Sequence, residues 1–337
     1  MALFDLPLDR LETYRPEVRE PADLDASWAA TLADARRADP VADVRPVENG
    51  LVLVDTWDVT FRGFGAHPVR AWFSRPAHAG DADLPAVVEY LGYGRGRGLP
   101  HERLTWAAAG YAHLLMDTRG QGGQYGTGGD TDDPVGAGPA APGFLTRGIR
   151  EPAQHYYRRL VTDAVRAVDA VRELPGVDPR RVAVAGNSQG GGLALAAAGL
   201  VGDLTAVLAS VPFLCHPGRA LEITDAHPWQ EVVQYLSVHR GAQDAVLHTL
   251  SYVDGVNFAR RATAPALFAV GLRDTVCPPS TVFAAYNHYA GSPKEIAVHP
   301  FNGHEGGDAV HVRRQLEWLA ATMPSKTPSR APAASTV

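Results

Sequence analysis

The chain has 337 residues, of which 45% are hydrophobic, and a formal net charge of −6 at pH 7. This composition allows a large buried core and argues against a nucleic-acid-binding protein, which needs a basic surface. Two cysteines are too few for a disulfide framework, so reduced thiols are expected. The first residues lack the features of a signal peptide and no stretch has the length of a membrane span, which predicts a cytoplasmic protein without a membrane partner.

The first third of the chain is predicted to hold a lead-in and an antiparallel strand pair. Residues 1–40 are broken by prolines and contain one expected surface helix, over 24–37, with Asp23 as its N-cap. Two strands are expected over 52–61 and 69–73, on either side of a glycine- and proline-containing turn.

From residue 86 onward, expected strands and helices alternate, which is typical of a mostly parallel sheet with helices on both faces. The expected strands cover residues 86–91, 111–116, 182–185, 205–211, 265–270 and 295–299, and the expected helices cover 101–109, 157–174, 193–200, 279–290 and 308–323. Residues 212–259 are mostly helical and are interpreted as an inserted cap. The prediction is one α/β domain over residues 1–323, followed by a disordered tail over 324–337.

Two groups of charged residues lie in loops. Arg95 and Arg97 stand in a glycine-rich loop and are interpreted as solvated charges rather than a phosphate site. Asp130, Asp132 and Asp133 lie in a long loop over residues 122–150 and are interpreted as an acidic turn, since their spacing matches no calcium loop.

Ser188 stands between a short apolar strand and a helix-forming run, with Gly186 and Gly190 two residues to either side. This is the pattern of a nucleophile elbow. Only glycine at these flanking positions lets the strand and the helix approach a serine held in a strained conformation. The alternative interpretation is a glycine-rich turn that only packs a helix onto a sheet.

A serine hydroxyl becomes a strong nucleophile when an imidazole takes its proton, and the imidazole needs a third group to orient it. On folds with an elbow, the chain order is serine, then acid, then histidine. Asp274 directly follows the strand expected over 265–270, and His304 stands in a glycine-flanked loop after the strand expected over 295–299. Ser188, Asp274 and His304 are therefore the predicted catalytic residues.

Other titratable residues receive different interpretations. His299 is placed within a strand and His311 on a helix surface, while His216 and His227 in the inserted region could line a pocket. Asp254 is interpreted as a helix-end charge.

The oxyanion hole of such a site combines two backbone N–H groups. One belongs to the residue after the nucleophile, here Gln189. The other comes from the loop after the strand expected over 86–91, where Tyr93 is flanked by glycines. An ordinary glycine turn is the alternative interpretation of that loop.

Three motifs resemble the signatures of a known family, carbohydrate esterase family seven, which comprises the acetyl xylan esterases and cephalosporin C deacetylases. They are Asp117-Thr-Arg-Gly-Gln121, Gly186-Asn-Ser-Gln-Gly190 and His304-Glu305. The likeness continues through further stretches and covers about residues 1–323.

The resemblance implies an α/β-hydrolase fold and a serine esterase that removes acetyl groups from small sugars and from cephalosporin C. It also implies no metal or other cofactor, a cytoplasmic location and a hexamer built as a dimer of trimers. The family's catalytic residues match Ser188, Asp274 and His304, and its oxyanion donors match Tyr93 and Gln189.

Two more residues of the motifs, Arg119 and Gln121, are expected to support the site structurally. The chain also departs from the family. Leu91 stands where some members have histidine, and Asn187 stands where glycine is common. Gly94 and Arg95 alter a loop that often carries asparagine and then a small residue. These departures leave the fine specificity open.

Two other functions stay open at this point. One is a serine peptidase of the same fold, and the other is a catalytically silent binding protein with a hydrolase fold.

Overall fold

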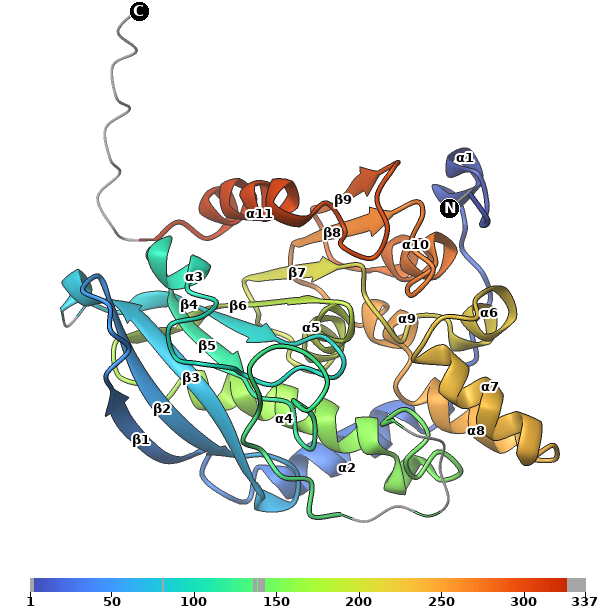
Figure 1. Ribbon diagram of the computed structural model, residues 1–337, viewed down its shortest axis with the longest axis horizontal. Helices are drawn as coiled ribbons and strands as arrows, with labels where there is room; N and C mark the ends of the chain where they lie inside the picture. The colour runs from blue at the N-terminus through green and yellow to red at the C-terminus, as the bar shows by residue number, and fades with distance from the viewer. Residues whose placement is uncertain (1–2, 81, 136–137, 139–142, 326–337) are drawn as a thin grey trace, which may run out of the picture.

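A single sheet of nine strands runs through the computed structural model, which describes residues 3–80, 82–135, 138 and 143–325 (Figure 1). In chain order the strands are β1 Val41–Val47, β2 Val54–Arg62, β3 Pro68–Pro76, β4 Leu84–Tyr90, β5 Ala112–Met116, β6 Val177–Asn187, β7 Ala206–Ser210, β8 Ala266–Gly271 and β9 Lys294–His299. In space their order is β1-β2-β3-β5-β4-β6-β7-β8-β9.

The sheet is antiparallel from β1 through β5 and parallel across β5, β4, β6, β7, β8 and β9. The parallel strands are apolar at successive positions, as Val87 and Val88 on β4 illustrate. Both side chains are fully buried because helices cover the two faces of the sheet. The predicted α/β class with a mostly parallel sheet is confirmed.

The α-helices of the described residues are α1 Leu8–Leu11, α2 Leu24–Ala35, α3 Thr105–Ala108, α4 Tyr156–Val171, α5 Gln189–Leu200, α6 Pro217–Ile223, α7 Trp229–Val238, α8 Gln243–Ser251, α9 Gly255–Ala259, α10 Pro279–His288 and α11 Asp308–Thr322. One face of the sheet packs on α3 and α11 through Trp106, Leu319 and neighbouring strand residues. The other face carries α4 and α5, and α2 lies beyond α4 (Figure 1). No helix in the described ranges is long and apolar enough to cross a membrane.

The structure differs from the expected elements in three places. The strand β1 was missed because its valines alternate with charged residues and because it contains Pro46, which an edge strand tolerates. The helix expected over 101–109 shrinks to the single turn of α3. Asp23 occupies the N-cap position of α2, but its carboxylate accepts a hydrogen bond from the Tyr252 hydroxyl rather than capping the helix.

Four helices, α6 to α9, lie between β7 and β8, where a helical insertion was expected.

Cys215 and Cys277 are free and buried, which confirms the expectation of reduced thiols. Of the expected disordered tail, residues 326–337 lie outside the described residues.

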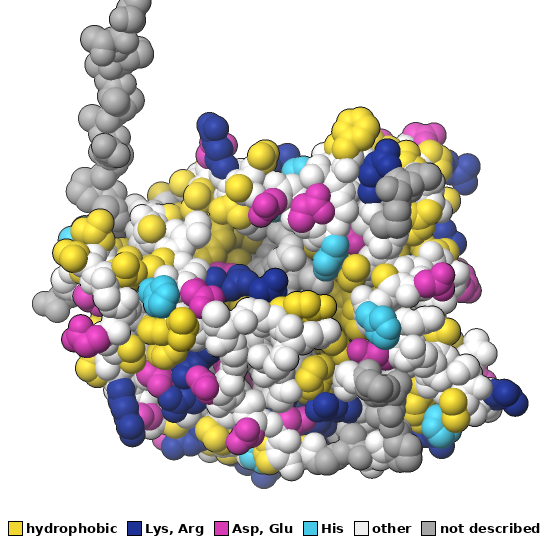
Figure 2. Space-filling view, viewed as in Figure 1, with side chains coloured by type: hydrophobic (Ala, Val, Ile, Leu, Met, Phe, Trp, Pro, Cys, Tyr) yellow, Lys and Arg dark blue, Asp and Glu magenta, His cyan; other side chains and the backbone are white. Residues whose placement is uncertain are grey.

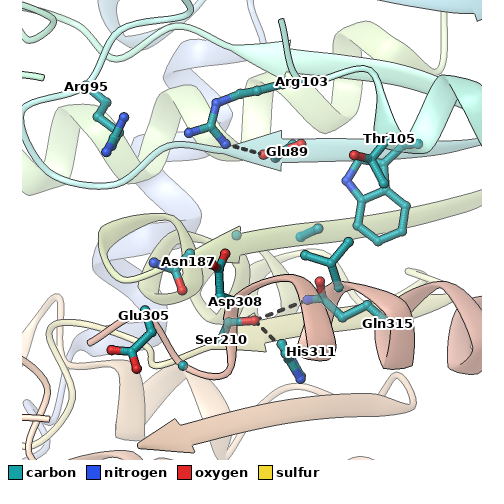
Figure 3. A pocket seen from close by; sticks show the side chains of 15 residues that line it. Glu89, Arg95, Arg103, Thr105, Asn187, Ser210, Glu305, Asp308, His311 and Gln315 are labelled. Carbon is teal, nitrogen blue, oxygen red and sulfur yellow. Dashed lines mark hydrogen bonds and ion pairs between the residues drawn. The ribbon is translucent and has the colours of Figure 1, made fainter. Parts of the chain in front are cut away.

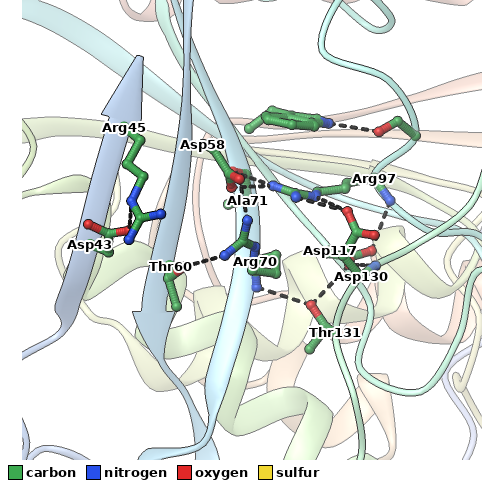
Figure 4. A network of polar contacts seen from close by, with 12 residues as sticks. Asp43, Arg45, Asp58, Thr60, Arg70, Ala71, Arg97, Asp117, Asp130 and Thr131 are labelled. Atoms are coloured by element: carbon green, nitrogen blue, oxygen red, sulfur yellow. Dashed lines mark hydrogen bonds and ion pairs between the residues drawn. The ribbon is translucent and has the colours of Figure 1, made fainter. Parts of the chain in front are cut away.

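Arg95 is exposed, as expected of a solvated loop charge, but Arg97 was misassigned. The Arg97 side chain is 3% exposed and pairs with Asp58 at 2.7 Å and with Asp130 at 2.9 Å (Figure 4). Its guanidinium also lies 3.8 Å from the centre of the Trp72 ring. Arg97 is therefore the centre of a buried network that joins β2 and β3 to the loops after β4 and β5, not a solvated charge.

Asp133 also corrects the interpretation of an acidic turn. Its carboxylate pairs with the buried guanidinium groups of Arg159, at 2.7 Å, and Arg119, at 3.4 Å. Two of the three loop aspartates thus neutralise buried arginines.

Candidate active site

The turn between β6 and α5 holds Ser188 at a strained positive φ, with φ 59° and ψ −120°. A Cβ atom on Gly186 would lie 2.2 Å from the carbonyl carbon of Gly190, and one on Gly190 would lie 2.1 Å from the carbonyl oxygen of Tyr90. Neither position can carry a side chain without moving backbone. The paired glycines of the sequence therefore have a steric cause, and the turn presents the serine hydroxyl at the end of the sheet.

Three side chains from the carboxyl-end loops of β6, β8 and β9 meet at this turn. His304 Nε2 lies 2.9 Å from Ser188 Oγ, and His304 Nδ1 lies 2.9 Å from Asp274 Oδ2. The other carboxylate oxygen of Asp274 accepts hydrogen bonds from the backbone N–H groups of Val276 and Cys277. Asp274 is fully buried, and these bonds fix its carboxylate against the imidazole. The structure thus brings together all three predicted catalytic residues.

The two predicted oxyanion donors, the N–H groups of Tyr93 and Gln189, have no acceptor among the described residues. Gln189 is the first residue of α5, where N–H groups have no partner within the helix. Ser188, His304 and Tyr93 all line one cavity of about 840 Å³. Ser188 and a residue whose backbone N–H has no acceptor among the described residues therefore line the same cavity.

The two histidines of the inserted region lie in different surroundings. His227 lines the cavity, together with Val276 and Phe144. His216 does not line it. Its ring packs against Tyr14, and burial lowers its pKa to about 4.

Gln121 connects the elbow with the loop that carries Tyr93. Its amide nitrogen donates to the Gln189 side-chain oxygen at 2.9 Å, and its own side-chain oxygen accepts from the N–H of Gly94 at 2.6 Å. Tyr157 donates to the same Gln189 oxygen. These bonds hold the two oxyanion-donor segments relative to each other.

Arg119 lies further from Ser188 than Gln121 does, and its contacts reach the site only through other residues. Its guanidinium forms a buried two-point pair with Asp163, at 2.5 and 2.8 Å, and its carbonyl accepts from Tyr156. Tyr156 in turn accepts from Gln121. Arg119 therefore contacts the scaffold around Gln121 and not the reacting groups.

Glu231 on α7 is a residue that the sequence did not single out. Its carboxylate accepts hydrogen bonds from the Tyr93 hydroxyl at 2.6 Å and from the N–H of Leu145 at 3.0 Å. Burial raises the pKa of Glu231. At Gly143, an added Cβ would lie 2.0 Å from this carboxylate. The inserted helices thus reach the Tyr93 side chain through one buried acid.

Asp274, Cys277 and His304 are the one group of metal-ligating side chains found in the described ranges, with ligand atoms within 4.8 Å of one another. Their chemistry does not suit a metal ion. Both carboxylate oxygens of Asp274 are engaged in hydrogen bonds, and burial raises the pKa of the Cys277 thiol, which keeps it protonated.

The interpretation of His311 as a surface residue is also wrong. It was placed on a helix surface, but it is 3% exposed, and its Nε2 lies 3.1 Å from the hydroxyl of Ser210. Burial lowers the pKa of His311 to about 4, so the ring is neutral at pH 7. The surface assignment failed because the partner, Ser210, lies about a hundred residues earlier in the chain.

Asp254 caps α9, as a helix-end charge should, and is fully enclosed there.

Comparison with known proteins points to one family. Residues 1–322 match the model of the acetyl xylan esterase (AXE1) family. The acetyl esterase Axe7A of Xylanibacter ruminicola is 29% identical over 311 residues, which are 91% of this chain and 69% of that protein.

Solved structures agree. An acetyl xylan esterase from Paenibacillus sp. R4 superimposes with a TM-score of 0.88 at 39% identity, covering 94% of this chain and 100% of that one. Acetyl xylan esterase 1 from Thermoanaerobacterium sp. JW/SL YS485 has a TM-score of 0.85 at 32% identity, covering 93% and 99%. An acylaminoacyl peptidase from Pyrococcus horikoshii, at 16% identity and a TM-score of 0.58, covers 81% of this chain and 41% of its own and shares only the α/β-hydrolase fold.

Proposed function

The chain belongs to the acetyl xylan esterase family, and from this premise we propose that it hydrolyses acetyl esters of small sugars by a serine mechanism. Acetyl ester hydrolysis is the reaction of the family, whose members are carboxylic ester hydrolases. The observation that carries the serine mechanism is the unbroken pair of 2.9 Å contacts from Ser188 through His304 to Asp274.

In the proposed reaction, His304 Nε2 accepts the hydroxyl proton while Ser188 Oγ attacks the acetyl carbonyl carbon. The negative charge that develops on the carbonyl oxygen is stabilised by the N–H groups of Tyr93 and Gln189. Asp274 orients the imidazole and stabilises its protonated form. The proton then passes from His304 to the departing sugar oxygen. Water, deprotonated by His304, attacks the acetyl-enzyme, which releases acetate and restores the serine.

The finer parts of the proposal concern substrate and assembly. Acetylated xylo-oligosaccharides and cephalosporin C are the proposed substrates, in a cytoplasmic hexamer built as a dimer of trimers. The sequence motifs shared with carbohydrate esterase family seven support these points. Light scattering for mass and activity on both substrates would test them.

The serine mechanism is tested by Ser188→Ala. We expect its turnover of p-nitrophenyl acetate to fall by about a million-fold, as when a nucleophile of this kind is removed. Ser237→Ala, an exposed serine on α7, is the matched control and should keep its activity. A Ser188→Ala enzyme with most of its activity would disprove the mechanism.

The alternatives are separated by two further measurements. Labelling of Ser188 by a serine-directed phosphonate distinguishes an active hydrolase from a silent binding protein. Hydrolysis of an acetylated xylo-oligosaccharide but not of an aminoacyl anilide distinguishes an esterase from a peptidase.

A further inference from the structure

A second cavity, of about 400 Å³, lies between α3 and α11 beside the carboxyl ends of β4, β6 and β7 (Figure 3). We propose that it is a subsite for a second sugar unit, so that the preferred substrate is an acetylated oligosaccharide rather than an acetylated monosaccharide. The proposal rests on the esterase function above. The volume lies within the range of small-molecule sites.

The cavity exists because this face of the sheet is incompletely covered. The helix α3 has only four residues, so it does not reach along the strands to meet α11. Trp106 and Leu319 pack against the strands of this face, and Trp106 also lines the cavity. Toward the carboxyl ends of the strands, small residues such as Ala185 and Gly186 line the floor. Figure 2 shows a hollow on this face of the molecule.

The second cavity adjoins the one that contains Ser188. Arg95, Asn187 and Glu305 line both cavities. Asn187 directly precedes Ser188. The N–H of Ser188 also donates to the carbonyl oxygen of Ser210, a residue that lines the second cavity. A molecule that places an acetyl group on the serine can therefore extend past these shared residues into the second cavity.

The shared residues have hydrogen-bonding capacity that the protein does not use. The side chains of Arg95 and Asn187 form no hydrogen bond with any described residue, and the Arg95 guanidinium only faces the Tyr125 ring at 5.7 Å. On the wall formed by β7 and α11, beside Asn187, Ser210 Oγ is held by His311 Nε2 and by the Gln315 amide nitrogen, each at 3.1 Å (Figure 3). This wall is buried and its side chains are fixed before any ligand arrives.

Charged side chains of both signs line the cavity. Glu89 pairs with Arg103 at 2.9 Å, whereas Arg95 has no carboxylate partner among the described residues. Glu305 and Asp308 lie across the cavity from the two arginines (Figure 3). An anion would meet these carboxylates and a cation would meet the guanidinium groups. A hydroxyl group can donate to the carboxylates and accept from the guanidinium and amide groups, which favours a neutral, hydroxyl-rich ring.

The test compares a methyl xyloside that carries one acetyl group with the two methyl xylobiosides that carry it on either ring. We expect kcat/KM of the better disaccharide to exceed that of the monosaccharide by about tenfold, from two or three added hydrogen bonds. Val312→Trp, which fills the cavity from α11, and Arg95→Gln should bring this ratio close to one. Arg313→Gln, a neighbouring residue that is 82% exposed, is the control and should keep the ratio.

Binding gives a second measurement that does not depend on turnover. In a Ser188→Ala background, calorimetry should find tighter binding of methyl xylobioside than of methyl xyloside, and the added Val312→Trp should abolish the difference. Equal kcat/KM values for monosaccharide and disaccharides in the wild type, or a preference that survives both cavity variants, would overturn the subsite. Failure of the esterase function would look different, because p-nitrophenyl acetate would then not be hydrolysed in a Ser188-dependent way.

Discussion

The hydroxyl of Tyr93 and the backbone of the same residue have separate tasks. The backbone N–H is a proposed oxyanion donor, while the hydroxyl donates to Glu231 and accepts from the N–H of Phe144. A side chain anchored at its far end restricts the rotation of its own peptide unit. Glu231 is therefore a positioning residue for the oxyanion hole, although it does not contact the substrate in the proposed mechanism.

Replacing Glu231 with alanine should lower kcat on p-nitrophenyl acetate by about tenfold to a hundredfold, less than the loss of a whole oxyanion donor. KM should change little, because the ground-state ester depends less on this N–H. Glu231→Gln keeps one acceptor oxygen and should recover part of kcat. Glu222→Ala, an exposed acid on the neighbouring α6, is the control. A Glu231→Ala enzyme with unchanged kcat would show that Tyr93 holds its place without this contact.

At the scale of elements, α9 depends on one buried acid. Asp254 is fully buried, and its carboxylate accepts from the N–H groups of Val256, in the first turn of α9, and of His216. Burial raises the pKa of Asp254 from 3.8 to about 7. Folding thus requires either a protonated acid or a costly buried charge.

The pH dependence of stability follows from this pKa. Between pH 3.8 and about 7, the folded protein retains a proton on Asp254 that the unfolded chain has lost, so the free energy of unfolding falls as pH rises through this window. In Asp254→Asn, which keeps the acceptor oxygen, this component should vanish. Urea unfolding of both proteins across this range should give a difference that changes by up to about 1.4 kcal/mol per pH unit. Parallel pH profiles would contradict the assignment.

The sequence predicted those elements whose signal is local. The central strands are continuous apolar runs, and the two elbow glycines stand at fixed positions on either side of Ser188, although the atoms that exclude a side chain at Gly190 belong to the distant Tyr90. Elements and residues that depend on distant partners were missed or misassigned. Arg97 and His311 look like surface residues until Asp58 and Ser210 are brought beside them. The order of Ser188, Asp274 and His304 could be predicted because the topology of the sheet fixes where each strand ends.

At the scale of the whole molecule, the Arg97 network connects the antiparallel and parallel parts of the sheet. Besides Asp58, Arg97 donates to the carbonyl oxygen of Ala71 on β3. Its backbone N–H donates to Asp117, which also holds the loop of Asp130 (Figure 4). The loop that carries Tyr93 ends in this network, so its position depends on strands far from the catalytic residues.

Arg97→Lys should therefore lower stability and activity together. Lysine keeps the charge but loses the planar, multiple hydrogen bonds and the contact with Trp72, and we expect a loss of about 2–3 kcal/mol in the free energy of unfolding. Chemical unfolding and kcat on p-nitrophenyl acetate measure the two effects. Arg37→Lys, whose side chain is 83% exposed in a surface ion pair, serves as the control. A stable Arg97→Lys protein with normal kcat would show that the network is dispensable.

The distance along the chain between Ser188, the proposed nucleophile, and His304, its proposed base, has a kinetic consequence. Ser188 and His304 are 116 residues apart, and they meet only at the joined ends of β6, β8 and β9. Contacts of such long range carry a large loop-closure entropy and form late in refolding. After dilution from denaturant, the recovery of esterase activity should therefore lag behind the recovery of the far-ultraviolet circular dichroism signal. The return of activity would then report on the last step of folding, in which Ser188 and His304 come together.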